Sequence, residues 1–205
     1  GIIGQLLSVN IVYFYFGFDF DFINSNIVIF LGILSNLYLI FIYQKTQLSD
    51  RSALIFLLID IFQLVILLYL TGGVINPFVI FILIPSVFAS SNLGLRTNLL
   101  LVLTTIIMIL FLTFFSKELP SPLNNHFHVS DYYYYSIPIA LVIALVFLNY
   151  FAIIFGAESR LRKEALNKME EVMAKEHEML SLGGQAAAAA HSLGTPLSTI
   201  KIITL

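Results

Sequence analysis

The sequence contains no cysteine and few charged residues. The absence of cysteine excludes disulfides and thiolate metal sites within these 205 residues. Lys, Arg, Asp and Glu together make up 11% of the chain, whereas about 25% is usual in soluble domains. The scarcity of charge therefore argues against a soluble globular domain.

Several functional signatures are also missing. The sequence has no P-loop and no glycine-rich lid, so nothing in it is expected to bind ATP. No basic patch or recognition motif indicates a nucleic-acid partner. The start of the chain lacks the basic and small-residue pattern of a cleavable signal peptide. The internal repeats and paired broken helices typical of transporters are absent as well.

Apolar residues dominate instead. They make up 59% of the chain, 19 of them phenylalanine, and the mean hydropathy is +0.95. Spans of a membrane need about 17–25 apolar residues. We predict six of them, the first clipped and the fourth short, at residues 1–17, 27–43, 53–70, 77–90, 98–115 and 136–156. Short polar connectors favour an all-α protein, an antiparallel six-helix transmembrane bundle.

Basic residues predict the orientation of this bundle. They gather in the connectors after spans two, four and six, whereas the other side holds only Lys117. Under the positive-inside rule the first group faces the cytoplasm, and both termini lie there. The basic residues of the first group are Lys45, Arg51, Arg96, Arg160, Arg162 and Lys163. The chain starts without methionine and stops inside a helical pattern, so we expect a fragment.

The charge of the chain is concentrated in a helix-favouring linker after the last span. We predict three parts: a transmembrane sensor domain (1–157), a helical linker (158–182) and a truncated dimerisation domain (183–205). The linker carries an apolar stripe that suits a coiled coil between two copies of the chain. Its members are Leu166, Met169, Val172, Met173, Met179 and Leu180. Gly183 and Gly184 follow it and predict a flexible point.

The last stretch, AAAAAHSLGTPLSTI (186–200), holds a single histidine. The alanine run is strongly helical. Pro196 removes the hydrogen-bond partner of the Ser192 carbonyl, so the backbone is expected to loosen or kink there. A heptad frame places His191 at an e position beside the dimer seam, where an exposed imidazole can act as a nucleophile. A lone histidine is more often a surface residue without chemistry.

The motif H-S-L-G-T-P-L resembles the H-box of sensor histidine kinases, and with the preceding alanines it is similar to the redox-sensing RegB/PrrB kinases. The resemblance implies that His191 is the phosphoacceptor, with Thr195 and Pro196 completing the motif. The position after the histidine is often acidic in the family and serves as a general base. Here it is Ser192, whose neutral hydroxyl is a poorer base than a carboxylate.

A second motif, LLYLTGGVINPF (67–78), lies between the third and fourth spans. Gly72 and Gly73 permit backbone conformations that other residues avoid. Asn76 followed by Pro77 is typical of a helix start, with Asn as the N-cap. The helix N-terminus suits a carbonyl or anionic oxygen, and Phe78 offers a flat apolar surface to a ring, as Tyr69 does. From these residues alone, a hairpin turn without a ligand remains the more common outcome.

The pattern G-G-x-x-N-P-F is similar to a heptad that RegB/PrrB-type kinases carry at this place, where it is implicated in ubiquinone binding. The resemblance implies that Gly72, Gly73, Asn76, Pro77 and Phe78 contact the quinone. Asn76 would hydrogen-bond a quinone oxygen, and the glycines would let the ring approach the backbone. The resemblance covers nearly the whole chain.

Together these resemblances imply a homodimeric sensor kinase of a bacterial inner membrane, surrounded by lipid, that responds to the redox state of the quinone pool. A downstream domain would bind ATP and Mg²⁺ and phosphorylate His191, and the phosphoryl group would then pass to a response regulator. The family's redox-active cysteine lies beyond the H-box. The alternatives are a degenerate quinone-binding receptor, indicated by Ser192, and a small transporter.

Asp60 and Gln63 share one face of the third span. An intramembrane carboxyl group is by default a functional hypothesis, but interhelical hydrogen bonding is the commoner explanation. Asn36 in the second span and Asn149 in the sixth are candidate partners, but the sequence does not pair them. Two histidines, at 126 and 128, lie in a loop without the further ligands of a metal site, so we predict no metal.

Overall fold

The computed structural model describes residues 1–42, 49–122 and 130–203 and divides the chain into two compact units, Gly1–Gly156 and Ala157–Leu205. Within the described residues nearly all regular structure is helical. The exception is a pair of two-residue strands, β1 (Phe18–Asp19) and β2 (Ser121–Pro122), which run antiparallel. The predicted all-α class is confirmed.

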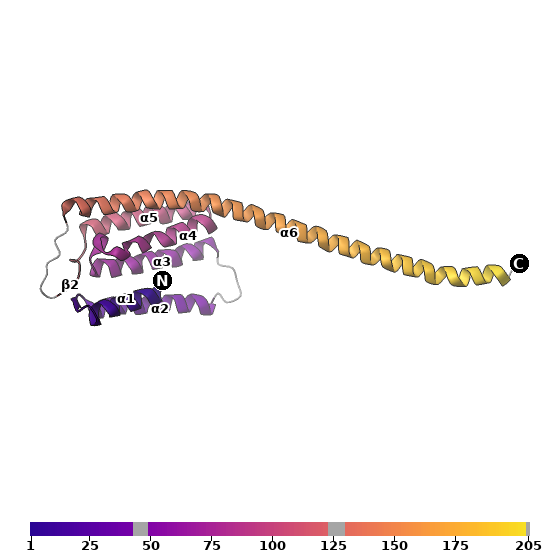
Figure 1. The fold of residues 1–205 in the computed structure, drawn as a ribbon, viewed down its shortest axis with the longest axis horizontal. Helices are drawn as coiled ribbons and strands as arrows, with labels where there is room; N and C mark the ends of the chain where they lie inside the picture. The colour runs from indigo at the N-terminus through magenta and orange to yellow at the C-terminus, as the bar shows by residue number, and fades with distance from the viewer. Residues whose placement is uncertain (43–48, 123–129, 204–205) are drawn as a thin grey trace. The chain divides into compact units, whose positions relative to one another are not determined.

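The first unit is a bundle of helices lying side by side (Figure 1). The elements before the central turn are α1 (Ile2–Phe14), α2 (Phe22–Ile42) and α3 (Asp50–Leu70). The turn itself contains η1 (Gly73–Ile75) and leads into η2 (Pro77–Leu83), α4 (Ile84–Asn92) and α5 (Leu95–Phe114). The helix α6 (Asp131–Ile203) begins in this unit and continues into the second.

Each of the six predicted apolar segments contains a described helix, but these helices differ in length. Four described helices are long and apolar enough to cross a membrane: Phe22–Phe41, Asp50–Leu70, Leu95–Phe114 and Asp131–His191. The helices Ile2–Phe14 and Pro77–Asn92 are apolar but shorter. The first ends three residues before Gly17, whose φ of 64° belongs to a turn. The second is bounded by the Asn76 cap and by Gly94, the N-cap of α5.

The main apolar core lies between α3, η2, α4, α5 and the first part of α6. Large, fully buried side chains of this core include Ile61, Leu68, Ile82, Leu101, Ile109, Leu112 and Leu145. A smaller cluster of Val9, Ile29 and Leu67 joins α1, α2 and α3. Large apolar side chains also cover the outside of the bundle. Because lipid is as apolar as these side chains, close packing and hydrogen bonds have to hold the helices together.

The second unit consists of the later part of α6. Ion pairs one turn apart, Arg162–Glu158 at 2.6 Å and Lys175–Glu171 at 2.7 Å, support the helix. The predicted apolar stripe is exposed along it, for example Leu166 and Met173. The helix runs through Gly183, Gly184 and Pro196 to Ile203. Glycine and proline therefore do not end the helix at the points where we predicted a flexible or loosened backbone.

Candidate functional site: the turn between α3 and α4

The turn after α3 has the backbone that its sequence predicts. Gly72 and Gly73 have φ angles of 111° and 60°, in the left-handed region that glycine tolerates. Asn76 caps the next helix, since its side-chain oxygen accepts a hydrogen bond from the Phe78 N–H at 2.9 Å. Pro77 occupies the first helical position. The predicted helix start is confirmed, and its first turns are 3-10 rather than α.

The amide nitrogen of Asn76 also makes hydrogen bonds within the turn. Its Nδ2 donates to the Thr71 carbonyl at 2.8 Å and lies 2.9 Å from the Thr71 hydroxyl. That hydroxyl donates to the Leu67 carbonyl at the end of α3. Asn76 is only 9% exposed. The amide therefore ties the end of α3 to the start of η2.

The two glycines lie directly beneath the segment that follows α5. A Cβ added to Gly72 would lie 2.5 Å from Cδ1 and 2.9 Å from Cα of Leu119. A Cβ added to Gly73 would lie 2.3 Å from the Ser116 Cβ and 2.9 Å from the Leu112 carbonyl. Residues 116–119 thus occupy the space against the glycines. A quinone ring would reach this turn from another side, or only after the segment moves.

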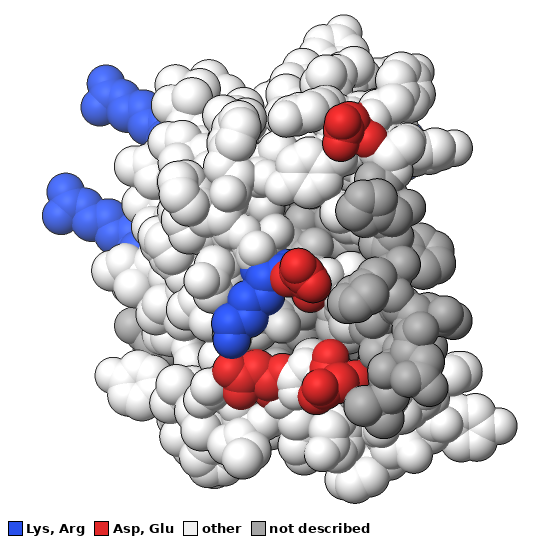
Figure 2. Space-filling model, turned by 90° about the vertical axis from the view of Figure 1, so that its left-hand side faces the viewer, with Lys and Arg blue, Asp and Glu red and all other residues white. Residues whose placement is uncertain are grey.

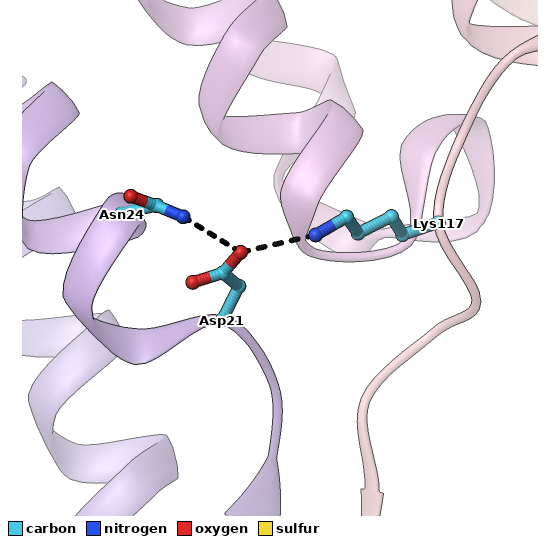
Figure 3. A network of polar contacts seen from close by, with 3 residues as sticks. All are labelled: Asp21, Asn24 and Lys117. Carbon is cyan, nitrogen blue, oxygen red and sulfur yellow. Dashed lines mark hydrogen bonds and ion pairs between the residues drawn. The ribbon is translucent and has the colours of Figure 1, made fainter.

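Lys117 anchors this covering segment. Its backbone N–H donates to the Tyr69 carbonyl at 3.0 Å, and its ammonium group forms a 3.0 Å ion pair with Asp21. Asn24 donates to the same carboxylate oxygen at 2.9 Å (Figure 3). The hydrogen bonds from Asn24 and then from Lys117 hold the pKa of Asp21 below its usual range, because they stabilise the ionised form. Sequence reasoning used Lys117 only for topology and missed this contact.

The end of the bundle that carries the turn is only sparsely charged. Figure 2 views this end and shows acidic side chains beside a basic one, with further basic side chains at the left edge and mostly uncharged surface between them. Phe18 and Asp19 of β1 pair with Pro122 and Ser121 of β2, respectively, beside the ion pair. The connector after α1 and the connector after α5 are therefore joined by the pairing of β1 with β2 and by the ion pair between Asp21 and Lys117.

Two rows of stacked aromatic rings lie near the turn, one within η2 and one formed by α3 and the end of α5. Phe78 stacks on Phe81 within η2, with ring centres 5.9 Å apart and planes inclined by 23°. Tyr69 stacks on Phe111 at 6.4 Å, and Phe111 stacks on Phe115 at 5.4 Å. The rings of Phe78, Phe111 and Phe115 are all partly exposed. Each row offers a flat apolar surface against which a planar ring can pack.

The intramembrane polar residues are joined to neighbouring helices. Gln63 donates to the Gln5 side chain in α1 at 2.9 Å, and Gly32 of α2 leaves room for the Gln63 side chain. Asn36, one of the two candidate partners, lies beside the Asp60 carboxyl group and donates to the Gly32 carbonyl at 3.1 Å. Asn149, the other candidate, contacts Ser86 and Ser90 of α4 instead. Gln5 was missed because a single glutamine in an apolar segment carries no positional signal.

His191 is exposed on α6 in the second unit. The neighbouring motif residues Ser192, Thr195 and Pro196 belong to the same helix, and their side chains lie outside the described part of the chain. The loop histidines at 126 and 128 also lie outside it. Among the residues that the structure does describe, no group of three or more His, Cys, Asp or Glu side chains could hold a metal ion.

Comparisons with known proteins bear on the family. The chain is 33% identical to the sensor histidine kinase RegB of Cereibacter sphaeroides over 174 residues, which cover 84% of this chain and 38% of RegB. It is 39% identical to a RegB from a particular strain of that species over 66 residues, 32% of this chain and 14% of the relative. The chain thus spans less than two-fifths of the length of these relatives. No family model and no solved structure matches it.

The similarity to RegB runs through most of the sequence rather than through a single motif. It accompanies an all-helical fold with membrane-length apolar helices, and a long helix that carries an exposed histidine. The chain therefore belongs to the RegB-type family of sensor histidine kinases.

Proposed function

We propose that this chain is the membrane sensor and phosphoacceptor part of a redox-responsive histidine kinase. The observation that carries the proposal is the position of His191 on α6, the same helix whose first part belongs to the membrane bundle. A change in the bundle that shifts or rotates the first part of α6 would be passed along this helix toward the phosphoacceptor. The similarity to RegB supports this assignment.

The chemistry at His191 is phosphoryl transfer to an imidazole nitrogen. The neutral imidazole attacks the γ-phosphorus of ATP, a nitrogen–phosphorus bond forms, and the bond to the ADP oxygen breaks. ATP and Mg²⁺ would be held by a part of the protein outside this chain. The phosphoryl group would then pass to an aspartate of a response regulator. Ser192 would have to hold or orient the imidazole without the basicity of a carboxylate.

Ubiquinone is the proposed ligand of the turn between α3 and η2. Its ring would pack on the exposed face of Phe78, at the level where the helix starts. Both hydrogens of the Asn76 amide already point at Thr71. A quinone oxygen would therefore have to compete with Thr71 for Asn76, and binding would loosen the link between α3 and η2. Through this competition a bound ligand would change the conformation of the turn.

The assembly that we propose is a homodimer in a bacterial inner membrane. The exposed apolar stripe of the second unit, including Leu166, Met173 and Leu180, would form the seam of a two-stranded coiled coil. The two shorter apolar helices would complete six spans, and the basic residues would place both termini in the cytoplasm.

The test uses the full-length protein, including its downstream sequence, in membranes with labelled ATP and either oxidised or reduced ubiquinone. We expect label in the wild type, no label in His191→Gln, and a quinone effect that is lost in Asn76→Ala. If labelling requires His191 but is the same with oxidised and reduced ubiquinone, the kinase assignment stands and the proposal of quinone sensing is refuted. Asn92→Ala is the matched control, because this exposed asparagine lies on α4 away from the turn.

A second candidate follows from Ser192. If the wild type incorporates no label but still binds quinone, the protein is a catalytically degenerate receptor of the family. Restoring an acidic residue by Ser192→Glu would then be expected to recover labelling.

A further inference from the structure

A buried polar cluster joins α4, α5 and α6. It consists of Ser86 and Ser90 of α4, Asn98 of α5 and Asn149 of α6, which are 0%, 3%, 6% and 5% exposed. Burying polar groups among apolar helices is unfavourable unless they find hydrogen-bond partners. Neither the H-box nor the GGxxNPF turn includes any of these residues.

The hydrogen bonds of the cluster converge on Asn149 and Ser90. The Asn149 amide donates to the Leu145 carbonyl at 2.7 Å, which orients its Oδ1 toward α4. This oxygen accepts from Ser90 and lies 3.4 Å from the Ser86 hydroxyl. In the described bundle the cluster is thus a direct polar contact between the α4 and α6 side chains.

Ser90 has more acceptors than it has hydrogens. Its single hydroxyl hydrogen faces Asn149 Oδ1, Asn98 Oδ1 at 2.8 Å and the Ser86 carbonyl at 3.1 Å. Turning the Asn98 amide makes it a donor to Ser90, which then donates to Asn149. Turning it back leaves Ser90 free to bond within α4. Turning the Asn98 amide would therefore let Ser90 exchange its acceptor without a change in the residues of the cluster.

A second close approach lies farther along α6. A Cβ added to Gly156 would lie 2.4 Å from the Ser91 carbonyl oxygen and 2.8 Å from the Ser91 Cα. The backbone of α6 thus touches the end of α4. At the opposite end, α4 continues directly from η2, which starts at the Asn76 cap. A displacement of the turn therefore moves a helical segment that contacts α6 at Asn149 and Gly156.

We infer that Ser90 and Asn149 are positioning residues that transmit a change in the turn to α6. When η2 and α4 shift, Ser90 exchanges its acceptor, and Asn149 holds α6 in a different position. This inference rests on the proposed function for its readout, which is phosphorylation of His191. It does not depend on quinone being the natural ligand, because a substitution in the turn can replace the ligand as the perturbation.

The experiment is a double-mutant cycle on the full-length protein in membranes. The initial rate of autophosphorylation is measured for the wild type, Asn76→Ala, Asn149→Leu and the double variant. We expect Asn76→Ala to change the rate about twofold or more, the lower end of measured couplings between distant sites. In the Asn149→Leu background the same substitution is expected to leave the rate unchanged.

Two further variants distinguish a loss of transmission from a general loss of folding. Ser90→Ala removes only a hydroxyl and is expected to abolish the effect of Asn76→Ala as well. Thr105→Val is the matched control: Thr105 is fully buried, and among the described residues its hydroxyl bonds to the Leu101 carbonyl of its own helix alone. It should leave the effect of Asn76→Ala intact.

The outcomes separate this inference from the proposed function. An Asn76→Ala effect that persists in both Asn149→Leu and Ser90→Ala refutes the transmission through the cluster, and so does an Asn76→Ala variant with the wild-type rate. If the cycle behaves as expected while oxidised and reduced ubiquinone give equal rates, the cluster keeps its role and the quinone assignment fails. His191→Gln is the control for the readout. Loss of labelling in this variant shows that the measured label is on His191.

Discussion

Asn76 hydrogen-bonds both the carbonyl and the hydroxyl of Thr71, five residues before it in the chain. The side-chain oxygen of Asn76 also accepts a hydrogen bond from the N–H of Phe78. One side chain thus closes the turn that carries the GGxxNPF motif and starts the helix that follows. Any ligand that engages Asn76 has to exchange these internal hydrogen bonds for its own.

Replacing Asn76 is expected to destabilise the protein even without a ligand. Loss of an N-cap side chain costs about 0.5–2 kcal/mol, and Asn76→Ala also leaves Thr71 without its donor. Asn76→Asp keeps the accepting oxygen and should fall between alanine and the wild type. Thermal unfolding in detergent measures the difference. An Asn76→Ala midpoint equal to that of the exposed-site variant Asn92→Ala would contradict the capping role.

Gly73 and Gly184 predict opposite effects of the same substitution. At Gly73 the φ of 60° and the Ser116 Cβ 2.3 Å away oppose a side chain. Gly73→Ala should therefore lower stability by about 1 kcal/mol or more. Gly184 is helical, and apart from its own helix backbone no atom of the described residues lies within 4 Å of an added Cβ. Gly184→Ala should thus favour the helix by roughly 1 kcal/mol. Thermal midpoints and helix content from circular dichroism test both substitutions. If Gly73→Ala and Gly184→Ala changed stability in the same direction, the different backbone conformations assigned to the two glycines would be refuted.

The ion pair between Asp21 and Lys117 predicts a pH dependence at the end of the bundle. The folded pKa of Asp21 lies below its ordinary value of 3.8. A carboxylate with a lowered pKa stabilises the fold above the unfolded value and loses that contribution as pH falls through the folded one. The midpoint difference between the wild type and Asp21→Asn should therefore be steady near neutral pH and shrink below about pH 4.

Asp19→Asn serves as the control for this pH experiment, because it removes the same charge from β1 without breaking the contact with Lys117. Added salt should also reduce the difference, since Lys117 and Asp21 side chains are 47% and 29% exposed. A difference that grows toward acidic pH would show that the ion pair does not stabilise the folded state.

The hydrogen bond between Gln63 and Gln5 predicts a coupling between α3 and α1. Polar pairs between membrane helices contribute about 0.6 kcal/mol on average in double-mutant cycles. Gln63→Leu and Gln5→Leu should each lower the unfolding free energy, and the double variant should lose less than their sum. Gln63→Leu combined with Asn92→Ala is the additive reference. Strict additivity for the glutamine pair would mean that the two side chains do not interact.

The sequence by itself determined the helical elements and their approximate bounds. Apolar segments with few charges can satisfy their backbone groups only within a helix when lipid surrounds them. The pair Asn76–Pro77 likewise marks its helix start from local chemistry alone, since the cap bonds a residue two positions away. The H-box around His191 was recognisable for the same reason: its residues are adjacent in the chain.

Only the tertiary structure decided which distant groups meet. Gln63 pairs with Gln5, Asn149 with Ser90, and Lys117 with Asp21, and none of these pairs has a fixed spacing that a pattern could reveal. The glycines of the turn were predicted for a conformation or a ligand, yet the chain places Leu119 and Ser116 against them. Such contacts depend on how helices pack, and that packing is fixed by the shape of the whole bundle rather than by local propensity.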